Sequence, residues 1–119
     1  MQSPLKFFLP VLISLGCTQA PPPAWRYIHA AIIAPNCATA GCHSSLTETY
    51  SLNLEDADVS YRALVSEGGF VDPGSARNSR LIYLLRGIEV RKPMPPGEPL
   101  SDGDIALIED WIQAGASRD

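Results

Sequence analysis

The stretch Cys37-Ala38-Thr39-Ala40-Gly41-Cys42-His43 brings two thiols and an imidazole into seven consecutive residues. A cysteine pair followed directly by histidine is the pattern that attaches a porphyrin, because the thiols add to its two vinyl groups and the histidine binds the iron. A methionine follows much later, in Arg91-Lys92-Pro93-Met94-Pro95-Pro96-Gly97. The sequence therefore predicts one covalent haem, with thioethers at Cys37 and Cys42 and with His43 and Met94 as axial ligands.

Two other interpretations of the cysteines stay open. Cys37 and Cys42 could form a disulfide in an oxidising compartment, although the adjacent His43 would then have no role. A zinc site would need four ligands, and beyond these three residues the processed chain offers only His29 and an unmodified Cys17 as further cysteine or histidine ligands.

The second axial ligand also has alternatives. Met94 is the one methionine that remains once Met1 is removed, and the flanking prolines restrict its backbone. A methionine can instead fill a gap in a core without binding iron. His29 could replace it and give a two-histidine haem, although a histidine on a short helix is more often hydrogen-bonded or partly exposed.

With both motifs in view, the sequence from about Trp25 to Ala116 resembles the c-type cytochromes, and more closely the small single-haem domains that combine Cys-x4-Cys-His with a Met-Pro-Pro-Gly loop. The usual spacer has two residues between the cysteines, whereas this one has four. The longer spacer must bulge outward, and Gly41 is expected to supply the backbone freedom. The resemblance implies an all-α fold, a small cytochrome c-like bundle of four to five short helices around one haem c.

The N-terminus has the pattern of an export signal over residues 1–16, with Lys6 before the apolar run 7–13. This run is too short for a membrane span, which needs about 20 apolar residues. Ser14-Leu15-Gly16-Cys17 resembles the lipobox of bacterial lipoproteins, in which the cysteine is acylated. An ordinary cleavable signal peptide with an incidental cysteine is the alternative. If Cys17 is acylated, residues 17–23 form a lipidated, proline-rich tether.

Length and composition favour one domain, residues 24–119. Removal of residues 1–16 takes away Lys6 and no acidic residue, so the net charge falls from -4 to -5. This acidic balance argues against nucleic acid as a partner, because phosphates require a basic surface. No phosphate-binding glycine motif or nucleophile motif is present.

Apolar residues fall mostly at helical spacing, and signals for strands are sparse. The pattern predicts helices from Ala24 to a stop at Pro35, from a cap at Asp56 or Asp58 to Gly68-Gly69, from Asn78 or Ser79 to Gly87, and from Ser101 to Gly115. By the resemblance, the Trp25 helix should pack against the Trp111 helix.

These features favour an exported electron carrier in the periplasm or on a bacterial membrane, with redox proteins as donor and acceptor. An enzyme is disfavoured, although the protein could be a subunit or partner of an oxidoreductase, and no small-molecule substrate is indicated. The alternatives are a haem-based sensor with a displaceable sixth ligand and a haem-free binding lipoprotein with a Cys37–Cys42 disulfide.

Two further expectations concern the surroundings of the haem. The charges of Arg91 and Lys92 could pair with haem propionates or mark the docking edge for an acidic partner. By the resemblance, a carbonyl of the 70–74 loop could orient His43.

Overall fold

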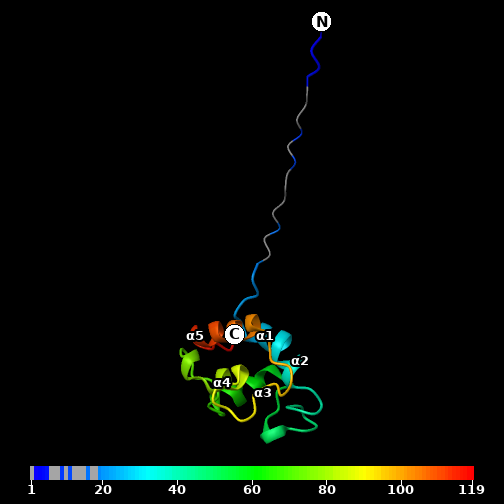
Figure 1. Ribbon diagram of the computed structural model, residues 1–119. Helices are drawn as coiled ribbons and strands as arrows, with labels where there is room; N and C mark the ends of the chain where they lie inside the picture. The colour runs from blue at the N-terminus through cyan, green and yellow to red at the C-terminus, as the bar shows by residue number, and fades with distance from the viewer. Residues whose placement is uncertain (1, 6–8, 10, 12–15, 17–18) are drawn as a thin grey trace.

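The computed structural model describes residues 2–5, 9, 11, 16 and 19–119 (Figure 1). Among these residues every helix lies beyond Ala24 and no β-strand forms, so the prediction of an all-α fold is confirmed. None of the helices in this part of the chain is long and apolar enough to cross a membrane. Most of the predicted signal peptide, and Cys17 with it, lies outside the described residues.

The first helical stretch is continuous and consists of α1 (Trp25–Ile28), a π-helical turn η1 (His29–Ile33) and α2 (Ala34–Cys37). Its buried face carries Trp25, Ile28, His29, Ile32 and Ile33. The prediction that Pro35 ends the helix is wrong. The N–H of Ala34 already bonds to the carbonyl of His29, five residues back, and this wider turn accommodates a proline that has no N–H to donate.

A second stretch combines α3 (Ala57–Tyr61) with the π-helical turn η3 (Arg62–Ser66). It begins as predicted at Asp56, whose carboxylate accepts hydrogen bonds from the N–H groups of Asp58 and Val59, each at 2.9 Å. These bonds favour the ionised form and lower the pKa of Asp56. The short 3-10 turns η2 (Thr49–Ser51) and η4 (Ala76–Asn78) precede α3 and α4, respectively.

The last two helices are α4 (Arg80–Arg86) and α5 (Asp102–Gln113). Gly87 ends α4 with a φ of 66°, as the sequence predicted. The hydroxyl of Ser101 caps α5 by accepting from the N–H of Asp104 at 3.1 Å. Arg86 and Glu109 form an ion pair of 2.7 Å that joins the two helices.

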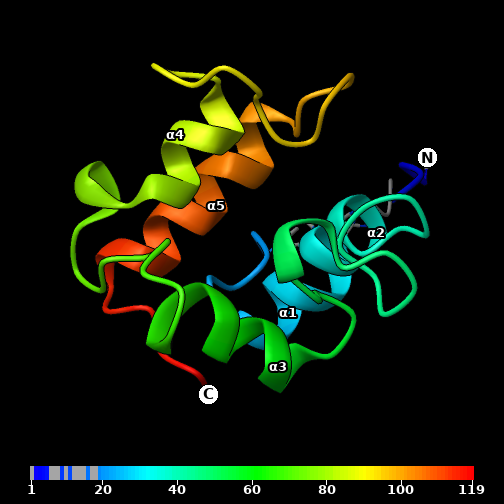
Figure 2. The same ribbon diagram turned by 90° about the horizontal axis from the view of Figure 1, so that it is seen from below.

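The core lies where the first and last helices meet. The rings of Trp25 and Trp111 stack with their centroids 5.0 Å apart, and Tyr61 meets the edge of Trp25 at 5.8 Å. The expected packing of these two helices is therefore confirmed. Helix α1 contacts both α3 and α5, while α4 lies along α5 (Figure 2).

Candidate functional site

A cavity of about 900 Å³ lies between the loop after α2, the η3 turn, α4 and the loop that follows α4. This volume falls at the upper end of ligand pockets, which span roughly 300–1,000 Å³. The residues around it come from four separate segments: His43, Tyr50, Ser51, Leu52, Ala63, Glu67, Gly68, Phe70, Arg80, Leu84, Glu89, Val90, Arg91, Lys92 and Met94.

A second hollow of about 100 Å³ is lined by Cys37 and Cys42, with His43 and Met94 also on its wall. His43 and Met94 thus line both spaces, which makes the two hollows neighbours. The structure brings all four residues predicted for haem attachment and ligation to one site. The cysteines do not line the larger cavity but sit beside it.

The loop between the two cysteines is closed by backbone hydrogen bonds. The N–H of Cys42 donates to the carbonyl of Thr39 at 2.9 Å, and that of His43 donates to the carbonyl of Cys37 at 3.0 Å. The expectation for Gly41 is wrong. Its φ is not in the positive range that favours glycine, and a Cβ added there would meet no atom within 4 Å.

Both thiols are free. Burial, with a smaller contribution from nearby Cys42, raises the pKa of the Cys37 thiol to about 11. Cys37 is therefore a neutral thiol near pH 7, in a position fixed by the end of α2.

The side chain of His43 has an unsatisfied atom. Its Nδ1 is buried and has no hydrogen-bond partner among the described residues. An unpaired buried polar atom costs about 1–3 kcal/mol, so a native site that keeps one calls for a functional explanation. An imidazole that is not engaged elsewhere, beside a large cavity, has the chemistry of a metal ligand.

The expected orientation of His43 by the 70–74 loop is not found. The carbonyl of Phe70 accepts from the N–H of Leu81 at 2.9 Å, and the carbonyl of Asp72 accepts from the hydroxyl of Ser79 at 3.4 Å. This loop is instead fastened to the start of α4. The backbone of His43 is held from another side, because the N–H of Leu54 donates to its carbonyl at 2.8 Å.

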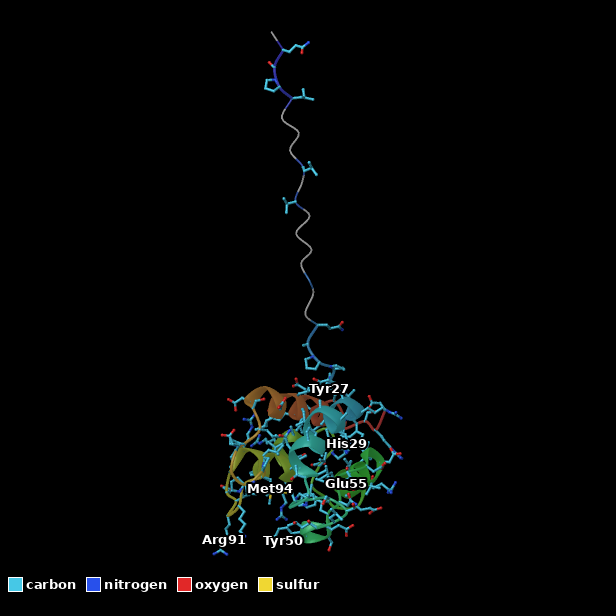
Figure 3. The ribbon with its side chains drawn as sticks, turned by 90° about the vertical axis from the view of Figure 1, so that its right-hand side faces the viewer. Tyr27, His29, Tyr50, Glu55, Arg91 and Met94 are labelled. Carbon is cyan, nitrogen blue, oxygen red and sulfur yellow. The ribbon has the colours of Figure 1, made fainter. Side chains whose placement is uncertain are left out.

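Met94 reaches the site from a proline-rich loop that folds back on α4. Its N–H donates to the carbonyl of Leu84 at 2.9 Å, which places the side chain at the boundary of the two hollows. Figure 3 shows Met94 inward of Arg91.

The charged side chains that line the cavity are Glu67, Arg80, Glu89, Arg91 and Lys92. Arg80 lies over the ring of Phe70, 5.8 Å from its centroid. Arg91 and Lys92 line the cavity and take part in neither of the two ion pairs formed by the described residues. Arg91 and Tyr50 project at the end of the folded part opposite Tyr27 (Figure 3).

His29 lines neither hollow. It is 7% exposed, and its Nε2 lies 2.9 Å from the carbonyl of Leu54. The carbonyl accepts this bond, so Nε2 carries the proton and is not available to bind a metal. The structure thus gives His29 the hydrogen-bonded role that the sequence also allowed.

Some residues of the site could not be predicted from the sequence. Gly68 was predicted only to end a helix, yet a Cβ on it would lie 1.9 Å from the carbonyl oxygen of Ala63. The wall formed by Leu52, Ala63, Phe70 and Leu84 joins segments that are far apart in the chain. In the described part of the chain, no three cysteine, histidine or acidic side chains gather closely enough to hold a metal ion.

No protein-family model, curated protein or solved structure matches this chain. The residues of the site therefore carry the functional argument on their own.

Proposed function

We propose that this chain is a small c-type haem protein that transfers electrons, with one haem bound covalently by Cys37 and Cys42. The observation that carries the proposal is that His43 and Met94 line the same cavity while both cysteines line the hollow beside it. An imidazole and a thioether are an established pair of iron ligands in electron-transferring haem proteins.

The residues present fit this group. The cavity of about 900 Å³ is large enough for a porphyrin, and iron binding would give a function to the His43 imidazole, whose Nδ1 is buried and unpaired. The apolar side chains of Leu52, Phe70 and Leu84 would cover part of a bound haem, and a low dielectric around a redox centre helps to set its potential. When bound, the haem supplies the one-electron change between ferrous and ferric iron.

The remaining side chains have supporting roles. Arg91 and Lys92 place positive charge on the cavity wall, where they can neutralise the two carboxylates of a haem. Cys37 and Cys42 line the smaller hollow beside this cavity, so their thiols could bond to the edge of a group that fills the cavity. Among the described residues, no hydrogen bond pairs the hydroxyl of Tyr50 or Ser51 on this wall with a histidine or a carboxylate, which favours the proposal of a carrier.

Export and a lipid anchor at Cys17 belong to the same proposal and rest on the sequence of residues 1–17. A protein held at the outer face of a bacterial membrane, or in the periplasm, would exchange electrons with redox proteins there.

The deciding experiment is to produce the full-length protein in a bacterium that attaches c-type haem. The denatured band should keep its haem-dependent peroxidase stain, and its mass should exceed that of the processed chain by one haem. Replacing both Cys37 and Cys42 with alanine should abolish the stain, whereas Ser45→Ala, a similar change two residues after His43, should keep it. A chain without haem and two hydrogens lighter than expected would show the disulfide instead.

A further inference from the structure

One residue, Leu54, connects the two histidines of the chain. Its carbonyl accepts a hydrogen bond from Nε2 of His29 at 2.9 Å, and its N–H donates to the carbonyl of His43 at 2.8 Å. Leu54 is 4% exposed, so both bonds lie where water does not compete for them. His29 and His43 are thus joined through a single buried residue.

The helical end of this connection is buried in the core. His29 opens the π-helical turn η1, and its ring lies 5.7 Å from that of Trp25 in the stacked aromatic core. Single π-helical turns inside helices often coincide with functional positions. The other end is a loop, because the residues from His43 to Leu54 form no helix except the short turn η2. The connection therefore ties the loop that bears His43 to the buried core of the fold.

We propose that His29 is a positioning residue for His43. It holds the carbonyl of Leu54, the N–H of Leu54 then holds the backbone of His43, and the imidazole of His43 is thereby kept at the cavity. This inference rests on the proposed function, because it takes His43 as the iron ligand. Loss of the donor at His29 would leave the buried carbonyl of Leu54 unpaired and release the segment that restrains His43.

The same helix offers a matched control. Nε1 of Trp25 donates to the carbonyl of Ala57 at 2.8 Å, so it ties α1 to the start of α3 without reaching His43. His29→Leu removes the first bond, and Trp25→Phe removes the second together with part of the indole that stacks on Trp111. Both variants lose a hydrogen bond from the first helical stretch and both are destabilised, but only His29 lies on the connection to His43.

The test follows two signals while the haem-loaded full chain is heated: the visible spectrum of six-coordinate haem and the far-ultraviolet signal of the helices. In the wild type and in Trp25→Phe the two signals should be lost together. In His29→Leu the six-coordinate spectrum should be lost at a clearly lower temperature than the helices, because the ligand loosens before the fold does. His29→Gln, whose amide can donate in place of Nε2, should bring the two transitions back together. Coincident loss in His29→Leu would overturn the proposal.

A measurement without haem separates this inference from the proposed function. In haem-free protein, hydrogen exchange at the Leu54 amide should be at least about tenfold faster in His29→Leu than in Trp25→Phe, because the amide that holds His43 is then free to open. Equal exchange in the two variants would overturn the role of His29. Absence of haem from the wild type would overturn only the proposed function. If His29→Leu does not fold, His29→Asn, whose shorter side chain does not reach Leu54, takes its place in both measurements.

Discussion

The backbone N–H of Met94 donates to the carbonyl of Leu84 at 2.9 Å, and this bond fastens the proline-rich loop to the last turn of α4. Helix ends leave carbonyls without partners inside the helix, and this loop satisfies one of them. Leu84 also lines the large cavity. The loop that carries the thioether is therefore positioned by the same helix that forms part of the cavity wall.

Met94→Ala should remove the weak red absorption band of sulfur bound to ferric haem and open the iron to carbon monoxide or cyanide. Axial ligands help to spread haem potentials over about 0.8 V, so we expect the reduction potential to fall by on the order of 100 mV. Val90→Ala, which changes another residue of the cavity wall, should keep the band. A wild type without the band, or a variant with an unchanged potential, would favour a haem sensor with an open sixth position.

Gly41 and Gly68 should respond differently to the same added methyl group. Gly41→Ala places a Cβ where no atom lies within 4 Å, so the free energy of unfolding should change by less than about 0.5 kcal/mol. Gly68→Ala places a Cβ 1.9 Å from the carbonyl oxygen of Ala63 and should cost at least about 1–3 kcal/mol. Denaturant unfolding measures both. A large fall in the free energy of unfolding for Gly41→Ala would mean that the four-residue loop between Cys37 and Cys42 requires glycine.

Arg91 and Lys92 should accelerate electron transfer with an acidic redox partner. Both are exposed, and neither joins an ion pair formed by the described residues. The transfer rate should fall as salt is added, and Arg91→Gln or Lys92→Gln should lower the rate and weaken its dependence on salt. Arg118→Gln removes the same charge from a side chain paired with Asp58 and is the control. Transfer rates that do not change with salt in the wild type or in any variant would leave Arg91 and Lys92 with only a structural role at the haem.

Asp56 should make stability depend on pH in the acid range. Its folded pKa is lowered, chiefly by the hydrogen bond from the N–H of Val59, below the ordinary value of 3.8. The ionised Asp56 carboxylate therefore stabilises the folded state. This contribution to the free energy of unfolding is fully present above pH 3.8 and is lost as the pH falls through the folded pKa. Asp56→Asn keeps a capping oxygen but cannot ionise, so its melting temperature should fall less between pH 5 and pH 2 than that of the wild type. Parallel curves for the two proteins would rule out this contribution.

Cys17→Ser should abolish lipid labelling. The protein should then remain as an uncleaved precursor in the cytoplasmic membrane or be released in soluble form, because several acyl chains are needed for firm anchoring. Labelling with a radioactive fatty acid, followed by membrane fractionation, measures this. Equal labelling of the wild type and the variant would show that Cys17 is not the acylated residue.

The sequence alone was sufficient for the helical class and for most helix starts, because capping and helical spacing act between near neighbours. Asp56, Ser101 and Gly87 have the local roles that their side chains, or the lack of one, predict. It also identified the cysteines, His43 and Met94 as candidates, since a covalent attachment motif is contiguous. The prediction that the first helix stops at Pro35 was wrong. A π-helical turn ends at Ile33, two residues before that proline, and the spacing of apolar residues does not reveal it.

Only the tertiary structure decided what surrounds these residues. The cavity joins His43 to Met94, which are far apart in the chain, and its wall depends on how α4 and η3 are placed by the core beneath them. The same packing gave His29 a backbone partner at Leu54, away from both hollows. Local preferences determine which residues form helices, but the burial of Trp25 against Trp111 determines how those helices lie, and the site is formed by that arrangement.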